Sequence, residues 1–300
     1  MATPIAASSV LTSSAMKWAV GGWSFFILEN LILSENRTYL ISQFGDDGYH
    51  IAYGTLSTAA MSSVFYGYFK KVKNASPMIW RLGGPAPLSA KLASFVCLSV
   101  GLGMASQVPP KLQIPVHYQG DIANSSGDES SINKNNNIGP VENATSSNNT
   151  EGGWKVRCPF DFTDNHSQKG EGNNQVHGLE RISRHPGLWS FGLLGLGSAL
   201  LVPSLPQRAW LAMPAMVAIV GGAHTDSRFR RGMGGELPVE YDEVTSNVPF
   251  VAMLTGAQGN VLEVCKEFAG EVKLLNAAIA VGAAGAYVLG KGRGAKIPFR

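Results

Sequence analysis

The sequence predicts an all-α fold: a polytopic transmembrane helical bundle of about six spans, with a long disordered insert between the third and fourth spans. Three observations predict it. Apolar runs separated by short polar segments recur along the 300 residues. Glycine and alanine are frequent inside these runs, as in helices that pack closely in a bilayer. The remaining polar residues are concentrated in one Asn- and Ser-rich block, which cannot bury enough apolar surface to fold.

This pattern divides the chain into five parts. Residues 1–15 are rich in Ala, Ser and Thr and contain no acidic residue, which is typical of either a flexible N-terminus or a targeting segment. Residues 16–110 hold the first three spans, 111–180 the polar insert, 181–290 the last three spans and 291–300 a basic tail.

The six spans follow from the apolar runs in order. They are 16–33, 50–69, 88–106, 187–202, 209–222 and 274–289. An even number of spans places both termini on one side and segments 34–49, 107–186 and 223–273 on the other. Glu29 and Asn30 interrupt the end of the first span, and a carboxylate within a span indicates a functional site or, close to a polar flank, an interfacial residue.

The central hairpin carries the densest group of chemically active residues. The turn from Pro203 to Pro206 joins its two apolar runs, so the outer ends of the runs return to the same level. One end carries Arg181, Arg184 and His185, and the other carries His224, Asp226, Arg228, Arg230 and Arg231. These imidazoles can ligate iron or another metal, and the guanidiniums favour an anion; the simpler interpretation is anchoring at lipid head groups.

Charge and cysteine content exclude some functions. A net charge of +3 gives no case for nucleic-acid binding, because the basic residues cluster at the ends of spans. The three cysteines lack the spacing of a metal site, and their odd number argues against a closed set of disulfides. The apolar spans imply membrane lipid as a partner.

Three motifs resemble those of the NnrU family of membrane proteins, which includes the 15-cis-zeta-carotene isomerases of plants and algae. They are Arg181-Ile-Ser-Arg-His-Pro-Gly-Leu-Trp189, Asp226-Ser-Arg-Phe-Arg-Arg231 and Thr245-Ser-Asn-Val-Pro-Phe250. The resemblance covers nearly all of the chain except residues 1–15 and the insert at about 111–178. It implies a small bundle in a plastid membrane that holds haem b between two axial ligands and isomerises a cis-carotenoid.

The resemblance also implies the site residues. His185 matches the family's Arg-His-Pro histidine and is the expected axial ligand. Asn30 stands where the isomerases have their second histidine, and an amide is a poor ligand for haem iron. We therefore hypothesise that His224 replaces it, so that His185 and His224 bind the metal. Arg181, Arg184 and Arg228 complete the predicted cofactor-binding set.

Two alternatives stay open from the sequence. The chain can be a non-catalytic NnrU-like membrane protein that binds a lipid or tetrapyrrole through the basic cluster, an interpretation that Asn30 favours. It can also be a membrane methyltransferase of the isoprenylcysteine methyltransferase-like group, which shares the Arg-His-Pro start of a helix. Those enzymes usually carry Glu where this chain has Asp226, which ranks this alternative last.

Overall fold

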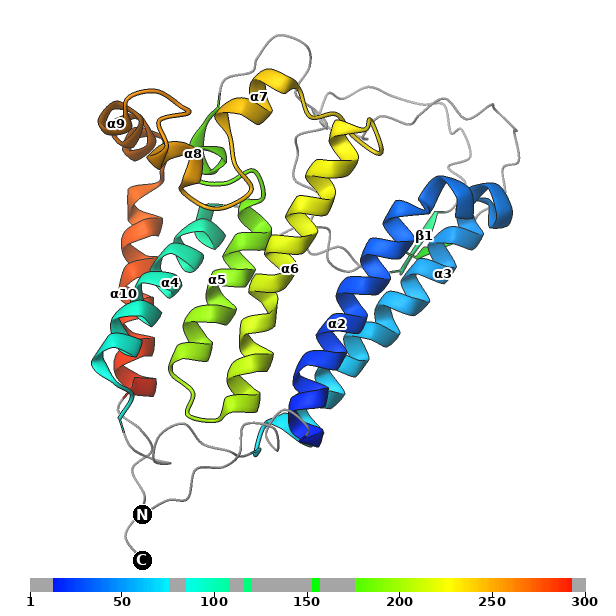
Figure 1. The fold of residues 1–300 in the computed structure, drawn as a ribbon, viewed down its shortest axis with the longest axis horizontal. Coiled ribbons are helices and arrows are strands. Elements are labelled where there is room, and N and C mark those ends of the chain that lie inside the picture. The colour runs from blue at the N-terminus through cyan, green and yellow to red at the C-terminus, as the bar shows by residue number, and fades with distance from the viewer. Residues whose placement is uncertain (1–12, 76–84, 108–115, 120–152, 157–175, 293–300) are drawn as a thin grey trace, which may run out of the picture.

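The structure, a computed structural model, describes residues 13–75, 85–107, 116–119, 153–156 and 176–292, and these residues are mainly helical (Figure 1). The helices are α2 (Ser14–Glu35), α3 (Arg37–Gly67), the π-helix η1 (Tyr68–Val72), α4 (Leu88–Gln107), the 3-10 helix η3 (Gly178–Arg181), α5 (Pro186–Leu200), α6 (Leu205–Arg230), α7 (Val239–Val244), α8 (Val251–Leu254), α9 (Val261–Glu271) and α10 (Leu274–Gly292).

Six long helices form the bundle, each packed against the next in the order α10, α4, α5, α6, α2 and α3 (Figure 1). Small residues allow the close approach that the composition predicted. A Cβ atom on Gly22 of α2 would lie 3.2 Å from the Cα of Val64, and one on Gly192 of α5 would lie 3.1 Å from the Cα of Ala215. The neighbouring backbones therefore pack directly against each other at these points.

The core runs along the middle of this row. Trp23 and Phe26 of α2, Trp189 of α5 and Val217 of α6 belong to one buried apolar cluster. Large apolar side chains also cover the outside of the bundle, among them Leu28 and Ile32 of α2, Leu92 and Val96 of α4, and Leu275 and Ile279 of α10. An apolar exterior of this extent is what a bilayer requires.

The prediction of six spans is confirmed only in part. Among the described residues, α4 and α10 are long and apolar enough to cross a membrane. The helix in place of the fourth span, α5, has 15 residues, fewer than the roughly 20 that cross a hydrocarbon core. The helices in place of the first, second and fifth spans are long enough, but they do not reach the same threshold of hydropathy.

Several predicted boundaries differ from the observed ones. The second span was expected to begin at residue 50, whereas α3 begins at Arg37 and bends at Gly45, which has a φ of 72°. The apolar run of the fifth span ends at Gly222, but α6 continues to Arg230 and so carries the basic motif on the helix itself. Residues 13–15 were placed in the flexible N-terminus, yet Ser13 caps α2 and its hydroxyl accepts from the Met16 N–H.

The polar insert contains structure that the sequence did not predict. Strands β1 (Val116–Gln119) and β2 (Gly153–Val156) pair in antiparallel register, with Val116 opposite Val156. Residues 176–180, also assigned to the insert, lead into η3 and pack at the bundle end. Most of the predicted disordered insert, the N-terminus up to residue 12 and the basic tail from residue 293 lie outside the described residues.

Candidate functional site at the mouth of the bundle

The N-terminal end of α5, the C-terminal end of α6 and the segments α7 to α9 gather at one end of the bundle, here called the mouth (Figure 1). The backbone brings the first and third sequence motifs together there. The Arg184 N–H donates to the Ser246 carbonyl at 2.9 Å, and the Phe250 N–H donates to the Ile182 carbonyl at 2.8 Å. The Ser183 hydroxyl adds a hydrogen bond to the Asn247 carbonyl at 2.6 Å.

The side chain of Asn247 connects the third motif to the helices. Its Oδ1 accepts from the Trp189 indole N–H at 3.0 Å, and its Nδ2 donates to the Ile219 carbonyl at 3.3 Å. Gly222 of α6 makes room for it, since a Cβ there would lie 2.4 Å from Asn247 Oδ1. Phe250 closes the segment in a left-handed conformation with a φ of 66°, which a non-glycine residue adopts only when its surroundings fix it.

His185 lies in a buried charge network on one side of α6. Pro186 opens α5 and leaves His185 at its N-cap, so the imidazole projects toward the last turns of α6. Its Nε2 lies 2.8 Å from Asp226 Oδ1, and Arg184 Nη2 lies 3.2 Å from Asp226 Oδ2. All three side chains are buried: His185 is 2% exposed, Asp226 3% and Arg184 5%. Both oxygens of the Asp226 carboxylate therefore contact protein partners and not solvent.

Asp242 of α7 extends this network. It accepts from Arg184 and, through two hydrogen bonds of 2.6 and 2.9 Å, from Arg230. The hydrogen bonds from Arg230 and then Arg184 outweigh the cost of burial and lower the pKa of Asp242 from its ordinary value of 3.8 to about 2. The network therefore ties α5, α6 and α7 together at neutral pH.

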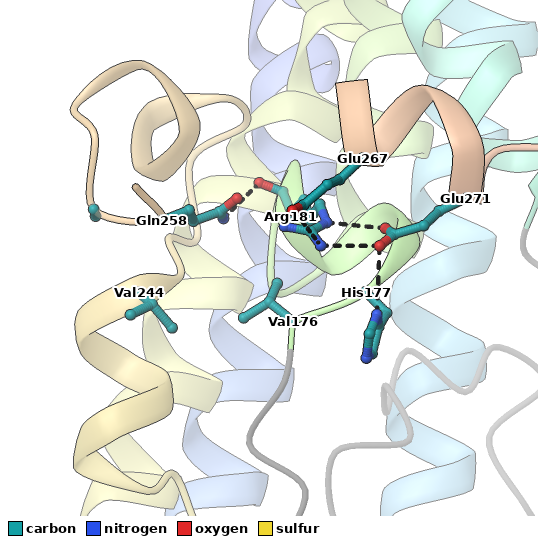
Figure 2. A pocket seen from close by; sticks show the side chains of 8 residues that line it. Val176, His177, Arg181, Val244, Gln258, Glu267 and Glu271 are labelled. Atoms are coloured by element: carbon teal, nitrogen blue, oxygen red, sulfur yellow. Dashed lines mark hydrogen bonds and ion pairs between the residues drawn. The ribbon is translucent and has the colours of Figure 1, made fainter. Parts of the chain in front are cut away.

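Arg181 lies in a different place. Figure 2 shows its guanidinium between Glu267 and Glu271 of α9, each with an oxygen 2.9 Å from Nη2. Glu271 also accepts from the Gly178 N–H at 2.6 Å, and its hydrogen bond with Arg181 lowers its pKa from 4.5 to about 2. These residues border a cavity of about 510 Å³ that the α8–α9 loop also lines.

His224 and Arg228 point to the other side of α6, toward α2. His224 Nε2 lies 2.8 Å from Ser34 Oγ and 4.0 Å from Glu35 Oε2. Ser34 is one helical turn beyond Asn30, so the structure places His224 beside the part of α2 where the resemblance expects a histidine.

Glu29 and Asn30 form a buried polar chain with α3. The Asn30 amide donates to Glu29 Oε2 at 2.7 Å and to the Phe26 carbonyl at 2.9 Å, and its Oδ1 accepts from the Tyr53 hydroxyl at 2.7 Å. Glu29 is 6% exposed, and its Oε1 has no hydrogen-bond partner among the described residues.

We call this second group the α2–α6 cluster. The buried phenol of Tyr49 lies in its middle, within electrostatic range of both Glu29 and Arg228. The cluster consists of Glu29, Asn30, Ser34, Tyr49, Tyr53, His224 and Arg228.

The five predicted site residues thus fall in three places. His185 and Arg184 lie in the buried network, His224 and Arg228 lie in the α2–α6 cluster, and Arg181 is paired with α9. Asp226 and His224 are two residues apart on α6, which corresponds to a rotation of about 200°. The two imidazoles therefore lie on opposite sides of this helix.

This arrangement does not fit a haem held between His185 and His224. The Nε2 atoms of the two histidines contact Asp226 and Ser34 instead. The described part of the chain contains no group of three or more His, Cys, Asp or Glu side chains that could hold a metal ion. The expected haem b and its two histidine ligands stay predictions, and they require His185 to leave Asp226.

Sequence reasoning missed Asp242, Asn247, Tyr49 and Tyr53. Asn247 lies in the third motif and Asp242 just before it, but neither was assigned a role, and each contacts a residue 58 positions away in the chain. A lone sequence carries no signal for such a pairing. Tyr49 and Tyr53 are spaced four residues apart on one helical face, and that spacing was the one available signal.

Comparison with known proteins gives one family. A family model described as NnrU protein matches residues 19–288, which include all three motifs and both groups at the mouth. No curated protein and no solved structure matches the chain.

Proposed function

We propose that this chain, which belongs to the NnrU family, is a multi-pass membrane protein that binds an apolar small molecule of lipid or tetrapyrrole type at the α2–α6 cluster. The observation that carries the proposal is the chain of Glu29, Asn30 and Tyr53. It places a buried carboxylate, one oxygen of which has no hydrogen-bond partner among the described residues, inside a helix that is mainly apolar. Burying such a group in a span costs several kcal/mol, on the order of 3, unless a ligand or partner uses it.

The surroundings of the cluster favour an apolar ligand with a polar end. Trp23 and Phe26 lie on the buried face of α2 one to two turns before Glu29, and the Trp23 indole nitrogen also has no partner among the described residues. Apolar walls with a few convergent polar groups are the usual make-up of a small-molecule site.

The same contacts favour binding without haem catalysis. The Asn30 amide uses both of its donors and its acceptor within the protein, and His185 is held by Asp226. Neither side chain is placed to ligate iron.

The test is the analysis of small molecules that copurify with the protein. We expect the wild-type protein in mild detergent to retain a lipid or pigment, which extraction and mass spectrometry would identify. Glu29→Gln and Tyr53→Phe should retain at most about a tenth of it. Asn36→Ala is the matched control, since Asn36 is exposed at the same end and donates only to the Ile32 carbonyl of its own helix. A wild-type protein without any stoichiometric organic ligand would overturn the proposal.

A second candidate is a haem-dependent cis-carotenoid isomerase of the plastid membrane. The position of His224 on α6 favours it, because His224 contacts Ser34, which lies one helical turn beyond Asn30 on α2. In that version His185 and His224 would hold the haem, which would supply redox chemistry, and His185 would have to give up its contact with Asp226. Purified protein would then show bis-histidine absorbance bands that vanish in both His185→Ala and His224→Ala, and cells lacking the protein would accumulate tri-cis-zeta-carotene. An unchanged spectrum in His224→Ala would rule this version out.

A further inference from the structure

Arg228 differs from the other arginines at the mouth because it has no acidic partner. Arg181, Arg184, Arg230 and Arg231 each make an ion pair with a glutamate or aspartate. Within the described ranges, Arg228 and Arg37 make none, and Arg37 is exposed to solvent while Arg228 is partly buried. Among the described residues of the mouth, Arg228 is therefore the partly buried guanidinium that makes no ion pair.

The guanidinium of Arg228 lies against the protein although it makes no ion pair among the described residues. Its Nε is buried and has no hydrogen-bond partner among the described residues. The other end of the guanidinium lies close to the turn after α6, since a Cβ on Gly234 would lie 3.2 Å from Arg228 Nη2. Unpaired buried donors are rare in folded proteins and mark places where a water, ion or ligand binds.

The charges around Arg228 favour an anion. Arg37, Arg231 and the Glu35 carboxylate all lie within electrostatic range of it, and Glu35 is paired with Arg231 through contacts of 2.5 and 2.9 Å. The buried hydroxyl of Tyr49 is also within range; it donates to the Leu33 carbonyl at 3.4 Å and would have to turn from that carbonyl to donate to a bound anion. The same turns of α2 expose Leu28 and Ile32 on the outside of the bundle, so the apolar exterior lies about one helix diameter, roughly 10 Å, away.

We propose that Arg228, assisted by Tyr49, is the anchor of an anion subsite that binds the phosphate or carboxylate head group of an amphiphile. A guanidinium suits this task because its planar fork can donate two parallel hydrogen bonds to such a group. The proposal rests on the proposed function, since it assigns the polar end of the ligand bound at the α2–α6 cluster.

The experiment measures the thermal unfolding midpoint of the full-length protein in a neutral detergent. The additives are dioleoyl phosphatidic acid, dioleoylglycerol with the same chains but no anion, and inorganic phosphate. Phosphatidic acid should raise the midpoint in a saturable way, because a ligand that binds only the folded state stabilises it. Dioleoylglycerol should have little effect. Stabilisation by phosphate as well would show that a free anion is sufficient, whereas phosphatidic acid alone would show that the tail is needed.

Arg228→Gln should weaken the apparent affinity for phosphatidic acid by about tenfold or more, as expected for losing a charged hydrogen bond. Arg231→Gln is the matched control and should keep the wild-type affinity, since Arg231 is occupied by Glu35. If Arg228→Gln does not fold, Arg228→Lys keeps the charge but not the fork and should show an intermediate loss. Equal affinities in the wild type and the Arg228 variant, or no stabilisation by either anion, would overturn the subsite. The copurification assay on Glu29→Gln measures the amount of ligand that stays bound during purification, whereas this assay measures stabilisation by added anions. The two proposals can therefore fail separately.

Discussion

At the scale of single residues, the mouth is stabilised by side chains that have little freedom to change. Asp226 is the clearest case, because it faces both His185 and Arg184 and all three are buried. Asp226→Ala would leave a buried guanidinium without one of its partners, so we expect it to lower the free energy of unfolding by about 3–5 kcal/mol.

The matched control for that substitution is Glu35→Ala. Glu35 and Arg231 pair at the same end of the bundle, but their side chains are 37% and 46% exposed. An exposed pair contributes little to stability, so this variant should unfold near the wild-type midpoint. Unfolding by SDS titration in detergent micelles measures both; similar losses in the two variants would contradict a structural role for the buried network.

Gly222 is a second residue with a sharp expectation. A Cβ there would overlap the Asn247 amide, which bridges Trp189 and Ile219. We expect Gly222→Ala to cost about 1–3 kcal/mol by forcing this amide away. Gly221→Ala is its neighbour and control, because the nearest atom to a Cβ at Gly221 is Leu188 Cδ1 at 3.8 Å. The difference in thermal midpoint between the two variants tests the fit.

At the scale of helices, the sequence predicts what is local and misses what is distant. The α5–α6 hairpin was predicted because Pro203 and Pro206 interrupt two apolar runs, and the two helices do pack against each other. The end of α6 was placed at Gly222 because the apolar run stops there. The helix instead continues to Arg230, where Asp242 of α7 accepts from that arginine, a contact that no local pattern reveals.

The candidate site shows the same division. The mouth itself followed from the order of the spans, which brought Glu29, Asn30, His185 and His224 to one end. Their grouping did not follow, because whether His224 faces Asp226 or Ser34 depends on the rotation of α6 about its axis. A hydrophobic pattern fixes that rotation poorly in a helix whose last turns are polar.

The elements that close the mouth should also make the protein sensitive to acid. Asp242 of α7 and Glu271 of α9 both have a pKa lowered to about 2, from 3.8 and 4.5, by their arginine partners. The unfolded chain therefore takes up these protons at a higher pH than the folded protein. Their stabilisation is complete above about pH 5 and is lost as the pH falls toward 2.

Hydrogen exchange of α9 at pH 5, 4 and 3 measures this loss. In Glu271→Gln the protection of α9 should be lower at pH 5 and change less on acidification. Glu263→Gln, an exposed residue on the same helix, should follow the wild type. Equal pH responses in both variants would contradict the assignment.

At the scale of the whole molecule, the row of six helices has charged residues at both ends and an apolar exterior between them, which favours a membrane-spanning orientation along the helix axes. The 20 residues of α4 extend about 30 Å, the thickness of a hydrocarbon core. If all six helices span, the α9 segment lies on one side of the membrane and the turn after η1 lies on the other (Figure 1).

Cysteine labelling in sealed vesicles tests this arrangement. Cys265 is exposed on α9 and serves as the probe of the mouth once Cys97 and Cys158 are replaced by alanine. Lys73→Cys, in a variant without the three native cysteines, probes the exposed turn after η1 at the opposite end. A membrane-impermeant maleimide should label one of these positions in intact vesicles and the other only after permeabilisation. Labelling of both from the same side would mean that the helices of the row do not all cross the membrane, because an odd number of crossings must separate the two positions.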